Sequence, residues 1–381
     1  MSKSRLVLTS LLVAPLLAAC GGGGGGGGGP SGVLLDSAVG GVDYSTSGGG
    51  LGTTDANGTF RYGNGQSVLF RIGDVILGNV QGAAVVTPVD LILGAADESD
   101  PGVINLARFL QTLDLDQDPS NGITVDESVR LAAVGVTIDF DQSVAAFETG
   151  EQTKVDTLTA GLPGGSRALV DAQMAQDHLG DTLRRVVAGR YDGRFVGDDA
   201  GPFHVFVDRN GSLFGWAVSA TDGLLELEGG ADTQGGFLAG NVSSGATFQG
   251  TIEGDGTLAG TWELSPESGT FSGTRSISVA DGLDDELIAL LAGTYEGTIV
   301  SSLGSSAFTL VLDAQGNLAV PPPDDQVSGT IVSTNGTSAS FRGLTSDGTE
   351  IRGTVQLSGA MSGNLENDLL GATATFTATR M

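Results

Sequence analysis

Alternating carboxylates after residue 113 are the best candidate for metal chemistry in this 381-residue sequence. Asp114, Asp116 and Asp118 alternate along a short turn, and Asn121 and Glu127 follow them. Hard Ca²⁺ takes about six to eight oxygen ligands, and carboxylates at alternate positions of a tight loop converge on one point. The spacing therefore predicts a calcium site with these residues as ligands. The alternative is a solvated acidic turn at the end of a helix.

The same segment resembles the loop of EF-hand proteins. Asp114, Asp116 and Asp118 match the first, third and fifth ligand positions of that family, and Glu127 follows the loop isoleucine as the family's bidentate glutamate does. Pro119 departs from the family by standing where its invariant glycine belongs, which implies a longer loop. The resemblance implies a bound Ca²⁺ with a structural role.

Catalytic motifs are absent from the sequence. It has no G-x-S-x-G elbow, no H-E-x-x-H pair and no catalytic cysteine. His178 falls on a predicted helix beside Asp177, His204 falls in a predicted strand, and neither has a serine motif near it. We therefore predict that the protein is not an enzyme. A carbohydrate-active enzyme or accessory module stays an alternative, because two carboxylates that flank a sugar meet only in three dimensions.

The N-terminus carries the pattern of an exported protein. Lys3 and Arg5 precede a short apolar run that ends in small residues, which is typical of a secretory signal peptide over residues 1–20. Leu17-Ala18-Ala19-Cys20 also resembles the lipobox of bacterial lipoproteins. That resemblance implies cleavage before Cys20 and its acylation, with fatty acids such as palmitate. Several acyl chains anchor a protein stably, where one chain alone is marginal.

A glycine run follows the proposed anchor. Residues 21–30 are nine glycines followed by a proline, and because glycine has no side chain for a packed core, the run predicts a flexible tether. In the lipoprotein family a glycine after the acylated cysteine implies the outer membrane, and a glycine tether implies display at the cell surface rather than in the periplasm.

The composition excludes some partners. The chain has 45 acidic against 17 basic residues, a net charge of −28. Nucleic acid requires basic surface, so we expect no nucleic-acid partner. The single cysteine excludes an intrachain disulfide framework.

Two blocks precede the C-terminal half of the chain. Residues 31–95 predict a β-sandwich-like domain of short strands with Gly, Asn and Asp turns. The stretches 36–42 and 52–60 resemble carboxypeptidase-regulatory-like domains, which are transthyretin-like β-sandwiches. Residues 96–187 predict a helical insert that contains the acidic loop, with helices near 101–113 and from Ala168 to Val187.

Residues 188–279 and 292–381 are an internal repeat, joined by a predicted linker helix over 280–291. Arg190-Tyr191-Asp192-Gly193 corresponds to 294–297, and 271–275 corresponds to 376–380. Turn signals about every ten residues predict a meander of about eight short strands in each copy, and closure into a barrel would remove the exposed edges. The alternative is a pair of open sandwiches. Trp216 and Trp262 are candidates for the wall of a ligand pocket, or for barrel core or girdle positions. The Gly- and Thr-rich meander pattern of the two repeats resembles the barrels of bacterial surface lipoproteins, including transferrin-binding proteins.

These patterns predict a mainly β protein with a small α insert: an N-terminal β-sandwich-like domain, a helical segment, and two tandem antiparallel meander β-barrels. We predict a non-enzymatic envelope lipoprotein that acts as a binding or adhesion module. Its partners would be the membrane, through the lipid anchor, and an unidentified protein, glycan or small ligand. The alternative is a lipocalin-like carrier of small molecules, and the two differ in whether the barrel interiors are filled or hollow.

Overall fold

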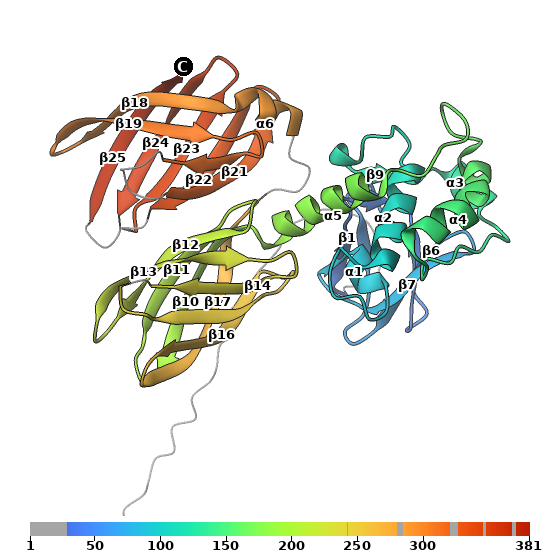
Figure 1. Cartoon of the computed structure of the whole chain (residues 1–381), viewed down its shortest axis with the longest axis horizontal. Helices are drawn as coiled ribbons and strands as arrows, with labels where there is room; N and C mark the ends of the chain where they lie inside the picture. Colours follow the sequence, from blue (N-terminus) through green and yellow to red (C-terminus); the bar gives the residue numbers. More distant parts are fainter. Residues whose placement is uncertain (1–28, 242, 280–284, 321–326, 346–347, 368–370) are drawn as a thin grey trace, which may run out of the picture.

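The computed structural model describes residues 29–381 apart from 242, 280–284, 321–326, 346–347 and 368–370. The predicted signal peptide, Cys20 and most of the glycine tether lie outside the described residues. Three bodies follow one another along the chain: the N-terminal unit (31–187), barrel 1 (189–278) and barrel 2 (293–380) (Figure 1). This confirms the predicted fold class. None of the described helices is long and apolar enough to cross a membrane.

Three small sheets form the β part of the N-terminal unit, with strand orders β5-β1-β8, β4-β3-β6-β7 and β2-β9. The turn predicted before β5 forms because the Asp55 carboxylate accepts the backbone N–H groups of Asn57 and Thr59. Gly58 in this turn has φ +73°, a conformation that favours glycine. The strands are β1 Ser31–Leu34, β2 Val39–Gly40, β3 Asp43–Thr46, β4 Leu51–Thr53, β5 Thr59–Arg61, β6 Ser67–Ile72, β7 Val75–Gln81, β8 Val85–Val86 and β9 Ile123–Thr124.

Helices cover these sheets and begin at polar caps. The side chains of Asp100, Asp126, Ser143 and Asp171 each accept a backbone N–H in the first turn of the helix that follows. The prediction of a helix from Ala168 is wrong by four residues, because the Asp171 cap fixes the start. The elements are α1 Pro88–Leu91, α2 Pro101–Leu113, the 3₁₀ turn Pro119–Asn121, α3 Glu127–Ala132, α4 Val144–Thr159 and α5 Ala172–Val187.

Sheets and helices of the N-terminal unit share one hydrophobic core. Phe60 and Phe70 from the sheets lie in the same buried cluster as Phe109 of α2 and Phe147 of α4. The helical insert therefore completes the core of the preceding strands. The likeness to carboxypeptidase-regulatory-like domains stays a prediction.

Both repeats are closed eight-stranded antiparallel meanders. Barrel 1 closes where β10 pairs with β17, and barrel 2 closes where β18 pairs with β25. Barrel 1 consists of β10 Gly189–Gly197, β11 Gly201–Val207, β12 Ser212–Ser219, β13 Gly223–Ala231, β14 Gly236–Gly240, β15 Thr247–Ile252, β16 Thr257–Leu264 and β17 Glu267–Ser278. Barrel 2 consists of β18 Gly293–Ser301, β19 Gly304–Leu312, β20 Asn317–Ala319, β21 Val327–Asn335, β22 Ser338–Thr345, β23 Glu350–Gln356, β24 Ala360–Asn367 and β25 Ala372–Arg380.

Apolar side chains fill both barrels. Phe195, Phe248 and Trp262 pack edge to face in barrel 1. Phe341 and Phe376 belong to the equivalent buried cluster of barrel 2. The described interiors are thus packed cores.

Each barrel is joined in the same way to the helix that precedes it. The Tyr191 hydroxyl donates to the Val187 carbonyl at the end of α5 (2.7 Å), and the Arg275 guanidinium donates to the Val186 carbonyl (2.5 Å). In barrel 2, Tyr295 and Arg380 donate to the carbonyls that end α6 (Asp285–Leu291). Because the last carbonyls of a helix lack intrahelical partners, these side chains satisfy them. The repeat unit is therefore a helix followed by a barrel.

Helix α5 connects the N-terminal unit to barrel 1 (Figure 1). Ala175, Leu179 and Leu183 pack against α1 and α2, and Val187 belongs to the core of barrel 1. One continuous helix therefore contributes to both cores and fixes their spacing.

Candidate functional site

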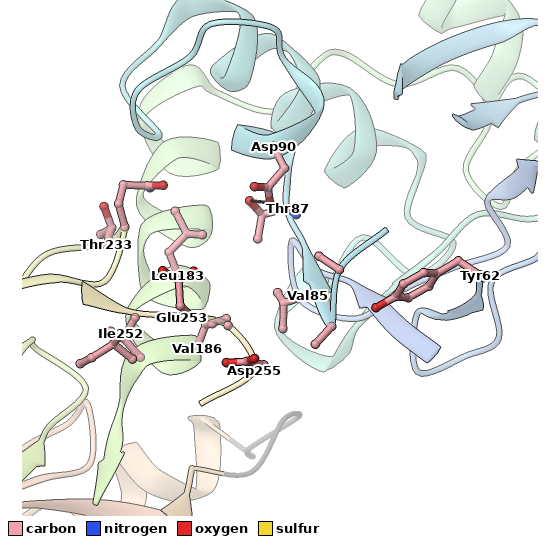
Figure 2. A pocket seen from close by; sticks show the side chains of 15 residues that line it. Tyr62, Val85, Thr87, Asp90, Leu183, Val186, Thr233, Ile252, Glu253 and Asp255 are labelled. Atoms are coloured by element: carbon pink, nitrogen blue, oxygen red, sulfur yellow. Dashed lines mark hydrogen bonds between the residues drawn. The ribbon is translucent and has the colours of Figure 1, made fainter. Parts of the chain in front are cut away.

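A groove of about 500 Å³ lies between the N-terminal unit and barrel 1, alongside the end of α5. Figure 2 shows Leu183 and Val186 of α5 between Val85 of β8 and the hairpin of barrel 1 that carries Ile252. A hydrogen bond from the Thr233 hydroxyl to the Glu98 carboxylate (2.6 Å) links the two bodies beside the groove. Ligand sites favour such domain interfaces, which makes the groove the candidate functional site.

Carboxylates stand on opposite walls of the groove (Figure 2). Asp90 accepts hydrogen bonds from the backbone N–H and the hydroxyl of Thr87. Across the groove, Glu253 and Asp255 lie on the turn between β15 and β16. Hydrogen bonds from the Thr257 backbone and hydroxyl hold the pKa of Asp255 below its usual value, so this carboxylate is charged at neutral pH. The groove thus has an apolar floor and an acidic rim.

Two smaller chambers adjoin the groove and share Val186 with it. The first, of about 270 Å³, shares Val85, Val186 and Gly254 with the groove and is also lined by Arg185 and Arg275. The second, of about 40 Å³, shares Arg185 and Val186 with the first. Carboxylates therefore line the groove, whereas arginine side chains line the two smaller chambers.

The smallest chamber ends at a polar cluster that the sequence does not reveal. Ser37, in the turn between β1 and β2, lies 3.1 Å from His178 of α5 (Oγ to Nε2). The neighbouring Asp36 is fully buried, and both of its carboxylate oxygens accept hydrogen bonds from the Gln111 amide (3.1 and 3.2 Å). Burial raises the pKa of Asp36 to about 7. Because 141 residues separate Ser37 from His178, no local motif marks their contact.

The acidic loop follows α2 directly. The Asp114 carboxylate accepts the backbone N–H groups of Asp118 and Thr124 (2.9 and 2.8 Å), and the Asp116 carboxylate accepts the Asn121 amide (3.1 Å). Asp118 accepts the Ser120 hydroxyl, and Glu127 is exposed at the first position of α3. Among the described residues, no three His, Cys, Asp or Glu side chains form a group that could hold a metal ion.

Electrostatics couples the first two carboxylates of this loop. Burial, together with the neighbouring Asp116 carboxylate, raises the pKa of Asp114 to about 6. Hydrogen bonds from Asp114 and Asn121 lower the pKa of Asp116.

The two tryptophans lie in different environments. Trp262 is in the core of barrel 1, and its indole N–H donates to the Val196 carbonyl (3.0 Å). Trp216 is on the outside of barrel 1, in a buried cluster with Phe206 and with Leu344 of barrel 2. The two side chains therefore do not line a common pocket.

Charged groups surround Trp216 where the barrels meet. Arg190 of barrel 1 pairs with Glu350 of barrel 2 (2.6 Å) and with Asp192 (2.9 Å). His204 lies against the Trp216 ring and contacts Asp192 (2.5 Å). Burial alone would raise the pKa of Asp192, but the hydrogen bonds from His204 and Arg190 outweigh it and hold that pKa well below its usual range. His204 thus belongs to the contact between the barrels.

No known protein family and no curated protein matches the chain. Among solved structures, a candidate outer membrane protein of Bacteroides fragilis NCTC 9343 is 10% identical, with a TM-score of 0.18, over 52% of this chain and 99% of that one. A mutant of the vaccine antigen Transferrin Binding Protein B from Haemophilus parasuis is 10% identical, with a TM-score of 0.17, over 48% of this chain and 66% of that one. At these values the likenesses assign no family, so function is argued from the residues of this chain.

Proposed function

We propose that the protein is a lipoprotein of the outer membrane, anchored through Cys20 and exposed at the surface, that binds a partner in the groove between its N-terminal unit and barrel 1. The observation that carries the proposal is the groove itself, with its apolar floor of Leu183 and Val186 and its acidic rim. The packed interiors of both barrels favour binding at an outer surface over a carrier role. The partner is a protein, a glycan or a smaller molecule with a positively charged group that faces the rim.

A photo-crosslinking residue in place of Gln234 tests the groove. Gln234 is exposed on the groove wall, and Gln315 is equally exposed on a hairpin of barrel 2 away from the groove. In the lipid-anchored protein on cells, light should produce an adduct from position 234 and none from position 315, read by gel shift and mass spectrometry. Equal adducts at both positions, or none at 234, would contradict the proposal. A Cys20→Ser variant should move the protein from the membrane to the soluble fraction, which separates failure of the anchor from failure of the groove.

We also propose that the acidic loop binds Ca²⁺. The proposal is supported by the place of Asp114, Asp116 and Asp118 in one turn, where the Asp118 backbone N–H donates to both of the other carboxylates. Asn121 and Glu127 would complete the oxygen ligands after the loop rearranges. The bound ion would hold the end of α2 to the start of α3.

Calcium is expected to raise the melting temperature of the protein. Ligand at about 100 times its dissociation constant stabilises the folded state by about 2.7 kcal/mol. Asp114→Ala combined with Asp116→Ala should abolish the rise, because both carboxylates are lost. The matched control is Asp139→Ala with Asp141→Ala, a second acidic pair outside this loop, which should keep the rise. Differential scanning calorimetry with Ca²⁺ or with EDTA measures both, and an unchanged wild-type melting temperature would refute the site.

A further inference from the structure

Ser37 and His178 have the arrangement of a nucleophile and its base. The Ser37 hydroxyl lies 3.1 Å from Nε2 of His178, within the range for direct proton transfer. The Ser37 backbone N–H donates to the Thr182 hydroxyl (3.2 Å), one turn further along the same helix. Two residues of α5 thus hold Ser37 from both its backbone and its side chain.

The backbone of Ser37 is strained. Its φ is +56°, and it is one of only two described non-glycine residues with a positive φ. An L residue adopts this conformation at a cost, and it persists where the surrounding structure enforces it, often at functional sites. Here the turn is short, since Leu35 and Ala38 form a bridge across Asp36 and Ser37. The strained turn presents the hydroxyl to α5.

A buried carboxylate lies beside the histidine. An oxygen of Asp36 is 3.9 Å from Nε2 of His178, and Gln111 of α2 fixes that carboxylate with two hydrogen bonds. When His178 takes a proton, positive charge develops at this nitrogen, and the nearby carboxylate stabilises it. Asp36 is therefore a positioning and electrostatic residue for His178.

Ser37 also lines a small cavity. Ser37 lines the chamber of about 40 Å³ together with Asn121, Thr182 and Arg185. A water molecule occupies about 30 Å³ in the liquid, so the chamber has room for only about one or two non-hydrogen atoms, which restricts the acyl group to a small one. Arg185 lines the same chamber, so it adds a positive side chain to the cavity that Ser37 lines.

We propose that Ser37 is a base-activated nucleophile that accepts small acyl groups from activated esters, with His178 as its general base. The Ser37 oxygen attacks the carbonyl carbon while Nε2 of His178 takes the hydroxyl proton. The tetrahedral intermediate expels the alcohol portion of the ester, which takes the proton from His178 and leaves O-acyl-Ser37. Attack by water, with His178 again as base, releases the carboxylic acid and restores the hydroxyl. This activity goes beyond partner binding and would overturn the prediction that the protein is not an enzyme.

Covalent labelling tests the proposal. The full chain is treated with a small fluorophosphonate, and p-nitrophenyl acetate is used in parallel to detect release of p-nitrophenolate. We expect one adduct per chain, mapped by mass spectrometry to the peptide that contains Ser37. His178→Gln keeps a hydrogen-bonding side chain without a base and should slow labelling by about 100-fold or more.

Two variants separate chemistry from folding. Ser37→Gly removes the nucleophile at a position whose φ suits glycine, so the variant should fold and lose all labelling. Ser99→Ala removes an exposed hydroxyl of the N-terminal unit that does not line the chamber, and this variant should label at the wild-type rate. Circular dichroism at 222 nm verifies the helices of each variant. The proposal is overturned if wild type labels no faster than Ser37→Gly, or if the adduct maps elsewhere.

Discussion

Replacement of Arg167 by methionine is expected to lower the free energy of unfolding of the N-terminal unit by about 3–5 kcal/mol. The guanidinium is buried and donates to the backbone carbonyls of Thr112, Asp114, Leu115 and Pro163. Methionine keeps the apolar stem of the side chain but leaves these carbonyls without that donor. Each buried acceptor that loses its partner costs about 1–3 kcal/mol.

Urea unfolding measures this change with two separate signals. The long helices, α2, α4 and α5, all belong to the N-terminal unit, so ellipticity at 222 nm reports mainly on that unit. Both tryptophans lie in barrel 1, so their fluorescence reports on that barrel. Arg71→Met is the matched control, because Arg71 is exposed on β6, and its effect should stay within about 0.5 kcal/mol. A similarly small effect for Arg167→Met would contradict the stabilising role of its guanidinium.

Asp36→Asn is expected to stabilise the N-terminal unit by about 2–4 kcal/mol at pH 8 and to have little effect at pH 4. Burial raises the pKa of Asp36 from 3.8 to about 7 in the folded protein. Between these values the folded state holds a proton that the unfolded state lacks. The contribution of Asp36 to stability is therefore full below pH 3.8 and is lost as the pH rises through about 7. The side-chain amide of the Asp36→Asn variant does not ionise, so the variant does not lose this stability as the pH rises.

Urea midpoints between pH 4 and pH 8 measure this effect. Asp177→Asn changes the same charge on the exposed face of α5 and serves as the control, with an expected change within about 0.5 kcal/mol. The wild-type protein should lose stability across this pH range relative to Asp36→Asn. Parallel pH profiles of the two proteins would show that the Asp36 carboxyl does not titrate in that interval.

The strands and turns of the two repeats, and the course of helix α2, could be predicted from the sequence because their causes are local. The turn at 208–211 in barrel 1 forms because the Asp208 carboxylate accepts two nearby backbone N–H groups, and Asp313 does the same in barrel 2. The two copies of this pattern, with their alternating apolar residues, indicate the repeat. Helix α2 likewise begins at its Asp100 cap and Pro101. Helix α4 lacks a clear apolar stripe in its sequence and was not predicted.

The orientation of Trp216 shows where local reasoning ends. Alternation places Trp216 on the opposite face of β12 from Leu213 and Ala217, which lie in the core of barrel 1. Both faces of this strand are apolar, so period-two alternation alone does not identify the inner face. The contact with barrel 2 determines which face of β12 points outward, because Leu344 and the Arg190–Glu350 pair cover that outer face.

The sequence by itself determined the tandem barrels, their repeat and the acidic loop after α2, since each depends on residues within a few positions of one another. It also contains the pattern on which the proposed anchor at Cys20 depends. Only the tertiary structure decided the groove and the contact between Ser37 and His178. Both depend on α5, which packs into two cores and brings a turn near the N-terminus to a helix 141 residues later. Such contacts follow from the packing of whole elements, which no short stretch of sequence encodes.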